Sequence, residues 1–224
     1  PVLAVDADAN SNLNEVLGVD VEMTLGDIRE NIAQAELAPV SPIPAGMTKA
    51  DYAEMMFSDA LTEADNFDLL VMGRTQGKGC YCYVNGILTT QVAKYAKNYR
   101  YIVVDNEAGL EHLSRGVLPQ VDTILLVSDC SRRGVQAAGR LAEMIGELKL
   151  GAKEVGLIIN RAPGGQISDG VRQEIDRYGM RLIGIVPHDD AVYEYDAEGK
   201  PSVTVPENSP VKQAVHRIFD QLSL

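Results

Sequence analysis

The sequence predicts an α/β fold of the doubly wound type, with three layers built around a mostly parallel sheet. Six short apolar runs recur along the 224 residues, and longer stretches with helical periodicity separate them. Each run is apolar throughout, which indicates burial on both faces, as in a parallel sheet covered by helices. The repeated strand–helix order favours helices on both sides of one sheet.

The predicted elements follow one another along the whole chain. The strands are predicted at residues 2–5, 69–72, 101–104, 123–127, 155–159 and 182–186. Thr24 with Asp27 and Thr48 with Asp51 have the spacing of helix N-terminal caps. Further helices are predicted at residues 85–99, 132–148, 167–178 and 210–222, and a loop at residues 38–46. No domain boundary is evident in this pattern, so we expect one domain over residues 1–224.

The last predicted helix, residues 210–222, has an apolar stripe along one side. The stripe consists of Val211, Val215, Ile218, Phe219 and Leu222. A helix lying on a membrane surface would need a strongly basic opposite face as well. Only Lys212, His216 and Arg217 are available for that face. We therefore expect this helix to pack on the sheet.

Composition narrows the class of protein. The net charge is −12, and a duplex-binding protein needs a cationic face, so we expect no nucleic-acid partner. No apolar run approaches the roughly 18 residues of a membrane span, and no signal-peptide pattern is present, so no membrane partner is expected. Three cysteines are too few for a disulfide framework, and a reducing cytoplasm is the predicted location.

Polar side chains follow several predicted strands, where ligands bind in open parallel sheets. Asp6 and Asp8 close the first strand and are followed by Asn10 and Asn12, and Asp105 closes the third. A strand-end aspartate can hold the water shell of a Mg²⁺ ion bound to nucleotide phosphates. The corresponding residues farther along are Asn160, Arg161, Pro187, His188, Asp189 and Asp190.

The glycine-rich stretch at residues 73–79 reads GRTQGKG. The phosphate-binding loop G-x-x-x-x-G-K-[ST] has four residues between its glycines, whereas this stretch has three. Gly79 also stands where the motif has the serine or threonine whose hydroxyl binds Mg²⁺. This stretch is therefore not predicted to cradle phosphates.

Cys80 and Cys82 form a C-x-C pair just beyond it. In an extended segment, residues i and i+2 point to the same side, so both sulfurs can face one ion. Soft thiolates suit Zn²⁺, Ni²⁺ or Cu(I), but two ligands leave a tetrahedral site incomplete. Two chains related by a two-fold axis would supply four sulfurs. The alternative is a pair of reduced thiols packed in a turn.

Four stretches together resemble one protein family. They are VDADAN after a strand, CYC, VVDNEAGLEHLSRG, and LIIN followed by arginine. The chain is similar over essentially its whole length to the deviant-Walker P-loop NTPases of the MinD/ParA/nitrogenase iron-protein class. More narrowly, it resembles the CooC-type ATPases that insert nickel into carbon monoxide dehydrogenase and acetyl-CoA synthase.

The resemblance implies catalytic and phosphate-side roles. Asp8 would orient the attacking water, Asp6 would support the same loop, and Asp105 would contact Mg²⁺ through water. Further contacts to ATP or ADP are expected from Asn12, Asn106, Glu107, Ala108 and Gly109, the last four as a switch that senses the γ-phosphate.

The resemblance also implies base-side and metal roles. Asn160 and Arg161 would lie against adenine, and the loop after Pro187 would close that pocket. Cys80 and Cys82 would bind Ni²⁺ or Zn²⁺ between the two protomers of a homodimer, whose client is the nickel enzyme.

One departure from the family is serious. The first strand, glycine-rich loop and first helix, a unit of roughly 30 residues, should precede residue 2. We expect a chain without this unit to bind ATP poorly or not at all. We favour an N-terminally incomplete chain, in which case the intact protein is the ATPase.

Three functions follow as hypotheses. The first is an ATP-dependent metallochaperone for nickel-enzyme maturation. The second is a partitioning or positioning ATPase acting on DNA or membrane, against which the net charge of −12 speaks. The third is a metal-binding module without catalysis.

Overall fold

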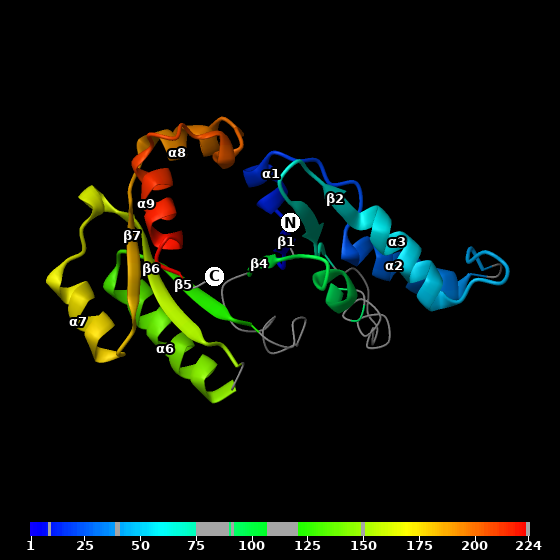
Figure 1. Cartoon of the computed structure of the whole chain (residues 1–224), viewed down its shortest axis with the longest axis horizontal. Helices are drawn as coiled ribbons and strands as arrows, with labels where there is room; N and C mark the ends of the chain where they lie inside the picture. Colours follow the sequence, from blue (N-terminus) through cyan, green and yellow to red (C-terminus); the bar gives the residue numbers. More distant parts are fainter. Residues whose placement is uncertain are drawn as a thin grey trace. The chain divides into compact units, whose positions relative to one another are not determined.

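The computed structural model describes residues 1–8, 10–38, 41–74, 90, 92–106, 121–148 and 151–222. It divides into two compact units, Pro1–Leu118 and Pro119–Leu224, and each has its own sheet (Figure 1). The following account therefore takes each unit by itself. The single domain predicted over residues 1–224 stays a prediction.

The described part of the first unit contains a four-stranded sheet in the order β2-β3-β1-β4. The strands are β1 (Val2–Asp6), β2 (Leu61–Glu63), β3 (Asp68–Val71) and β4 (Tyr101–Asp105). β1 pairs in parallel with β3 and with β4, and β2 adds an antiparallel edge to β3. The three predicted strands of this region are confirmed, whereas β2 was not predicted.

Helices α2 (Leu25–Leu37) and α3 (Lys49–Ala60) begin where the cap spacing predicted. At Thr24 and at Thr48, the threonine side chain and the aspartate three residues later form a reciprocal capping box. The helices pack on β1 and β3 around Phe57, which is completely buried together with Leu3 and Ile28. A short helix, α1 (Leu13–Leu17), follows β1 and was not predicted.

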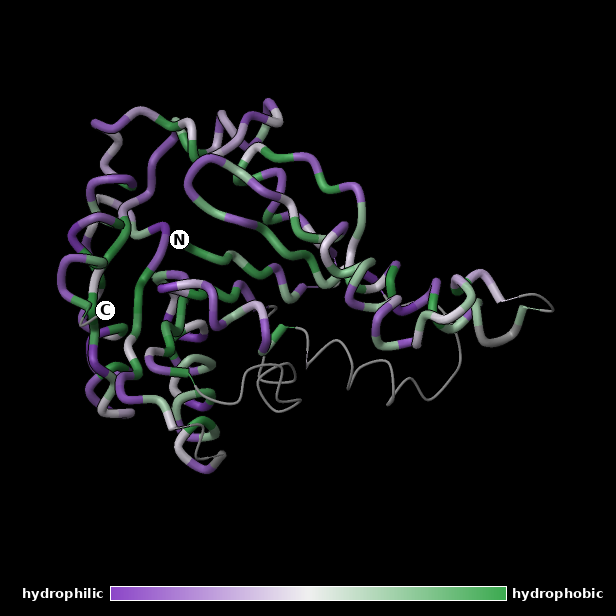
Figure 2. Tube along the Cα trace, turned by 45° about the vertical axis from the view of Figure 1, so that its right-hand side comes forward, coloured by the Kyte–Doolittle hydropathy of each residue, from purple (hydrophilic) through white to green (hydrophobic). Residues whose placement is uncertain are grey.

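The second unit has a parallel three-stranded sheet in the order β5-β6-β7. Its strands are β5 (Thr123–Asp129), β6 (Glu154–Ala162) and β7 (Leu182–Pro187), as predicted. Its helices are α6 (Arg132–Leu148), α7 (Asp169–Arg177), α8 (Asp190–Ala197) and α9 (Pro210–Phe219), with 3-10 turns η1 (Pro163–Gly165) and η2 (Ser202–Thr204). Figure 2 shows apolar strands beside helices of mixed polarity.

The last helix packs on the sheet, as predicted, through Val211, Ile218 and Leu222 of its apolar stripe, whereas Val215 and Phe219 of that stripe are exposed. α9 lies against β7, where Ala214 and Ile218 join the buried cluster around Ile183 and Val186. A side chain at Gly184 would collide with Ile218, whose Cγ1 would lie 2.3 Å from the added Cβ. The absence of a side chain there therefore allows the close approach of helix and strand.

The remaining predictions have mixed outcomes. Of the helix predicted at residues 85–99, positions 90 and 92–96 are helical, and 85–89 and 91 lie outside the described residues. The described part of residues 38–46 is non-helical, as predicted. None of the described helices is long and apolar enough to cross a membrane.

Candidate functional site

The carboxyl ends of β1 and β4 bring acidic side chains together in the first unit. Asp6 and Asp105 are register partners on these adjacent parallel strands, and Asp8 follows two residues after Asp6. Because paired strands lie about 4.8 Å apart, the two partners are neighbours at this edge of the sheet. Three residues predicted from the sequence are therefore gathered in one place, which we call the acidic edge.

Asp6 organises the chain that leaves β1. Its side chain is 1% exposed, and its carboxylate accepts hydrogen bonds from the backbone N–H groups of Asp8 and Leu13, both at 3.0 Å. A buried carboxylate requires such donors to offset the loss of water. Asp6 thus contacts both ends of the loop between β1 and α1.

Asp8 shapes the turn inside this loop. Its Oδ1 accepts from the backbone N–H of Asn10 at 2.8 Å and from the Asn10 side chain at 3.2 Å. Asn10 Oδ1 in turn accepts from a guanidinium nitrogen of Arg74 at 3.3 Å. Arg74 was not predicted as a site residue, although it lies only three residues after the end of β3.

The acidic edge shifts the pKa of Asp105 above its usual range. The larger cause is reduced contact with water, and the smaller cause is the negative charge of Asp6 and Asp8 nearby. A cation placed here would relieve this repulsion, and carboxylate oxygens are ligands that Mg²⁺ prefers. Within the described residues, no group of three or more His, Cys, Asp or Glu side chains could hold a metal ion on its own.

The other predicted residues of this unit are described only in part. Asn12 precedes α1 at its N-cap position without a side-chain cap bond, and the Asn106 amide donates to the carbonyl of Val104 at 3.2 Å. Five predicted residues lie outside the described residues: Glu107, Ala108, Gly109, Cys80 and Cys82.

In the second unit, Asn160, Arg161 and Pro187 lie at the carboxyl ends of the neighbouring strands β6 and β7. Ala162 and Pro187 are register partners, and the N–H of His188 donates to the carbonyl of Ala162 at 2.9 Å. The Asn160 side chain accepts from the N–H of Arg161 at 2.8 Å, and Arg161 has a left-handed backbone with φ of 55°. We call this the amide edge.

Asp129 at the end of β5 completes the amide edge but was not predicted. It is the register partner of Asn160 and accepts from the N–H of Ser131 at 2.9 Å. Hydrogen bonding to Ser131 lowers the pKa of Asp129. Its position two residues after an apolar run, beyond Ser128, could have pointed to it.

Residues 188 and 189, directly after Pro187, are non-helical as predicted, but a helix that was not predicted, α8, follows at Asp190. The carboxylate of Asp189 accepts from the N–H of Ala191 at 3.0 Å and so caps this helix. The hydroxyl of Ser209, which caps α9, donates to the same carboxylate at 2.7 Å. The two helices are thus tied together at their first residues.

Comparison with protein families gives a match over most of the chain. The model described as "CobQ/CobB/MinD/ParA nucleotide binding domain" matches residues 1–203. An uncharacterized ATP-binding protein of Methanocaldococcus jannaschii is 41% identical over 225 residues, which cover 99% of this chain and 86% of the relative.

Two further likenesses are more distant. The carbon monoxide dehydrogenase accessory protein CooC of Rhodospirillum rubrum is 27% identical, over 88% of this chain and 76% of that protein. The septum site-determining protein MinD of Pyrococcus horikoshii, solved with Mg-ADP, has a TM-score of 0.67 at 23% identity, covering 99% of this chain and 83% of that one. This structural likeness confirms the predicted fold.

Proposed function

Since the chain belongs to the CobQ/CobB/MinD/ParA nucleotide-binding domain family, we propose that it acts as an ATP-dependent metallochaperone. In this proposal, ATP and its hydrolysis govern the association of two copies of the chain. Nickel is the cargo, and the client is carbon monoxide dehydrogenase or acetyl-CoA synthase. The acidic edge of the first unit is the observation that carries the nucleotide part of the proposal.

We assign the phosphate side of ATP to the acidic edge. Asp6 and Asp8 shape the loop after β1 through hydrogen bonds to the N–H groups of Asp8, Leu13 and Asn10. This leaves Asp8 at the head of an ordered turn, where it is proposed to orient the attacking water. Asp105 is proposed to contact Mg²⁺ through water, and the ion, when bound, neutralises charge on the phosphates.

We assign the base side to the amide edge. An amide at Asn160 offers both donors and an acceptor to a purine ring, and the guanidinium of Arg161 can stack on it. Their backbone is held by the Asn160–Arg161 hydrogen bond and by a weak bond from the Cys130 thiol to the Arg161 carbonyl, at 3.7 Å. The segment after Pro187 is proposed to close on the base.

The nickel part of the proposal depends on the cysteine pair and on the distant likeness to CooC, at 27% identity. Two thiolates from each of two chains would make four soft ligands, the number a tetrahedral site needs. Cys80 and Cys82 are therefore proposed to hold the ion between two copies.

Nickel titration with and without Mg-ATP tests this proposal. We expect the wild type to bind one Ni²⁺ per two chains, with association that light scattering follows. The double variant Cys80→Ser/Cys82→Ser should lose this binding. Cys130→Ser is the matched control, because Cys130 lies after β5 and contacts Arg161 instead, and it should bind nickel as the wild type does. Undiminished nickel binding by the double variant would refute the proposed cargo site.

The alternative of a partitioning or positioning ATPase requires a basic surface, which a net charge of −12 disfavours. The basic side of α9 is weakened further, because Lys212 is already engaged by Glu207 and by two backbone carbonyls. Salt-sensitive binding to duplex DNA, or ATP-dependent recruitment to anionic vesicles, would favour this alternative instead.

A further inference from the structure

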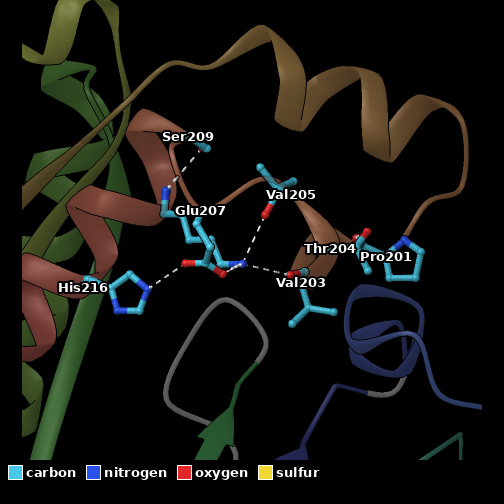
Figure 3. A network of polar contacts seen from close by, with 8 residues as sticks. Pro201, Val203, Thr204, Val205, Glu207, Ser209 and His216 are labelled. Carbon is cyan, nitrogen blue, oxygen red and sulfur yellow. Dashed lines mark hydrogen bonds and ion pairs between the residues drawn. The ribbon is translucent and has the colours of Figure 1, made fainter.

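The arm that follows Pro187, residues 188–209, is contacted by Lys212 of the next helix, α9. Lys212 lies in the first turn of α9, and its side chain is 26% exposed. Its ammonium donates to the carbonyls of Val203 at 3.3 Å and Val205 at 3.1 Å, and it pairs with the carboxylate of Glu207 at 2.5 Å. Figure 3 shows Val203, Val205 and Glu207 converging on one point.

The two carbonyls that accept from Lys212, those of Val203 and Val205, lie at the carboxyl end of the 3-10 turn η2. Within η2, the N–H groups of Thr204 and Val205 bond back to the carbonyls of Pro201 and Ser202. The carbonyls at the end of such a turn have no partner inside it, and a cation there is favourable. Lys212 supplies that cation from seven to nine residues farther along the chain.

The position of Lys212 in its own helix is unfavourable by contrast. A positive charge in the first turn of a helix opposes the macrodipole. The negative charge of Glu207 offsets this positive charge, and the bond to Lys212 lowers the pKa of Glu207 and so keeps it ionised. His216 contacts the same carboxylate at 3.8 Å. The lysine is therefore held by the arm rather than by α9.

A second connection fixes the other end of the arm. Ser209 is 6% exposed and donates to the Asp189 carboxylate, which caps α8 at the start of the arm. The Ser209–Asp189 bond thus joins the two ends of the arm. Lys212 contacts residues 203–207, which lie shortly before the second end.

We propose that Lys212 is a positioning residue for nucleotide binding, because it keeps residues 201–207 in the shape in which the arm closes on the base. This inference rests on the proposed function, which assigns the base side to the segment after Pro187. Lys212 itself touches neither the base nor the phosphates in this proposal.

Lys212→Met tests the inference, because methionine keeps an unbranched side chain and removes the charge. Hydrogen exchange in the nucleotide-free protein should show faster exchange of the Thr204 and Val205 amides. In the intact protein, the dissociation constant for Mg-ADP should rise roughly tenfold, which corresponds to about 1.4 kcal/mol. The rate of hydrolysis at saturating Mg-ATP should be unchanged, whereas a residue of the reaction centre would lower it.

Two further variants separate the contributions. Lys153→Met is the matched control, because Lys153 pairs with the exposed carboxylate of Asp122 at 2.8 Å and lies outside the arm, and it should leave both measurements unchanged. Glu207→Gln keeps the two carbonyl acceptors and should change nucleotide affinity less than Lys212→Met does.

Each negative outcome identifies what has failed. Unchanged exchange at Thr204 and Val205 in Lys212→Met would overturn the inference, and so would faster exchange without loss of Mg-ADP affinity. Absence of Mg-ADP binding in the intact wild-type protein would overturn the proposed function, while the exchange measurement would still report whether Lys212 holds the arm.

Discussion

The acidic edge and the amide edge both lie at the carboxyl ends of parallel strands. They differ in the direction in which they shift the pKa of a carboxylate. At the acidic edge, the charges of Asp6 and Asp8 contribute to raising the pKa of Asp105. At the amide edge and in the arm beyond it, hydroxyl and N–H donors lower the pKa of Asp129 and Asp189. Unrelieved negative charge suits the binding of a cation, whereas satisfied charge suits the shaping of a loop.

The largest effect is expected from Asp6→Ala, which breaks the acidic edge at its base. The variant leaves the N–H groups of Asp8 and Leu13 without their acceptor. We expect the free energy of unfolding to fall by roughly 3–6 kcal/mol, as for two hydrogen bonds to a charged group. Urea denaturation followed by circular dichroism measures this.

Asp8→Ala is the control, because the two bonds that Asp8 accepts from Asn10 are exposed to water, unlike those of the buried Asp6. Its loss should lower the free energy of unfolding by less than about 1.5 kcal/mol. If Asp6→Ala lowers the free energy of unfolding by no more than this control does, Asp6 does not organise the loop.

A smaller effect is expected in the second unit from Ser209→Ala. It removes the cap of α9 and the donor to Asp189. The free energy of unfolding should fall by about 1–2 kcal/mol, the upper range for an N-cap. Ser168→Ala removes the cap of α7, where the hydroxyl accepts from the N–H of Val171 at 3.3 Å. Equal losses in the two variants would mean that the bond to Asp189 adds no stability.

The smallest effect is expected when an aspartate of each edge is replaced by asparagine: the free energy of unfolding at pH 7 should change with opposite sign at the two edges. The raised pKa of Asp105 means that its contribution to stability is present below its ordinary value of 3.8 and is lost as the pH rises through the folded value. Asp105→Asn should therefore be more stable than the wild type at pH 7, and this advantage should shrink as the pH falls toward 3.8.

Asp129 should behave in the opposite way. Its lowered pKa contributes stability above 3.8, which is lost as the pH falls through the folded value. Asp129→Asn should be less stable than the wild type at pH 7. Urea denaturation at pH 7 and at pH 4 measures both variants, and the same sign for the two would contradict the comparison.

The strands and the capped helices could be predicted because their signals are local. Apolar runs identified the strands on which Asp6, Asp105 and Asn160 lie, and threonine–aspartate spacing identified the starts of α2 and α3. Both signals reflect the physical requirement itself, namely burial of a strand and capping of a helix end.

The elements that were missed depend on contacts distant in sequence. β2 is three residues long and exists through its pairing with β3, and α1 follows a loop that Asp6 holds. Arg74 joins the acidic edge only because β3 lies next to β1, which brings it to Asn10. Pairing of this kind is a property of the assembled sheet and leaves little trace in a short stretch of sequence.

The left-handed backbone at Arg161 has a consequence for how this protein could be engineered. A glycine would adopt that conformation without the steric penalty that a side chain incurs, which is of order 1 kcal/mol. Arg161→Gly would therefore trade a functional group for relief of backbone strain, so a search for thermostable variants could remove the guanidinium that the base is proposed to need. Screens of this chain should accordingly score ligand binding together with melting temperature.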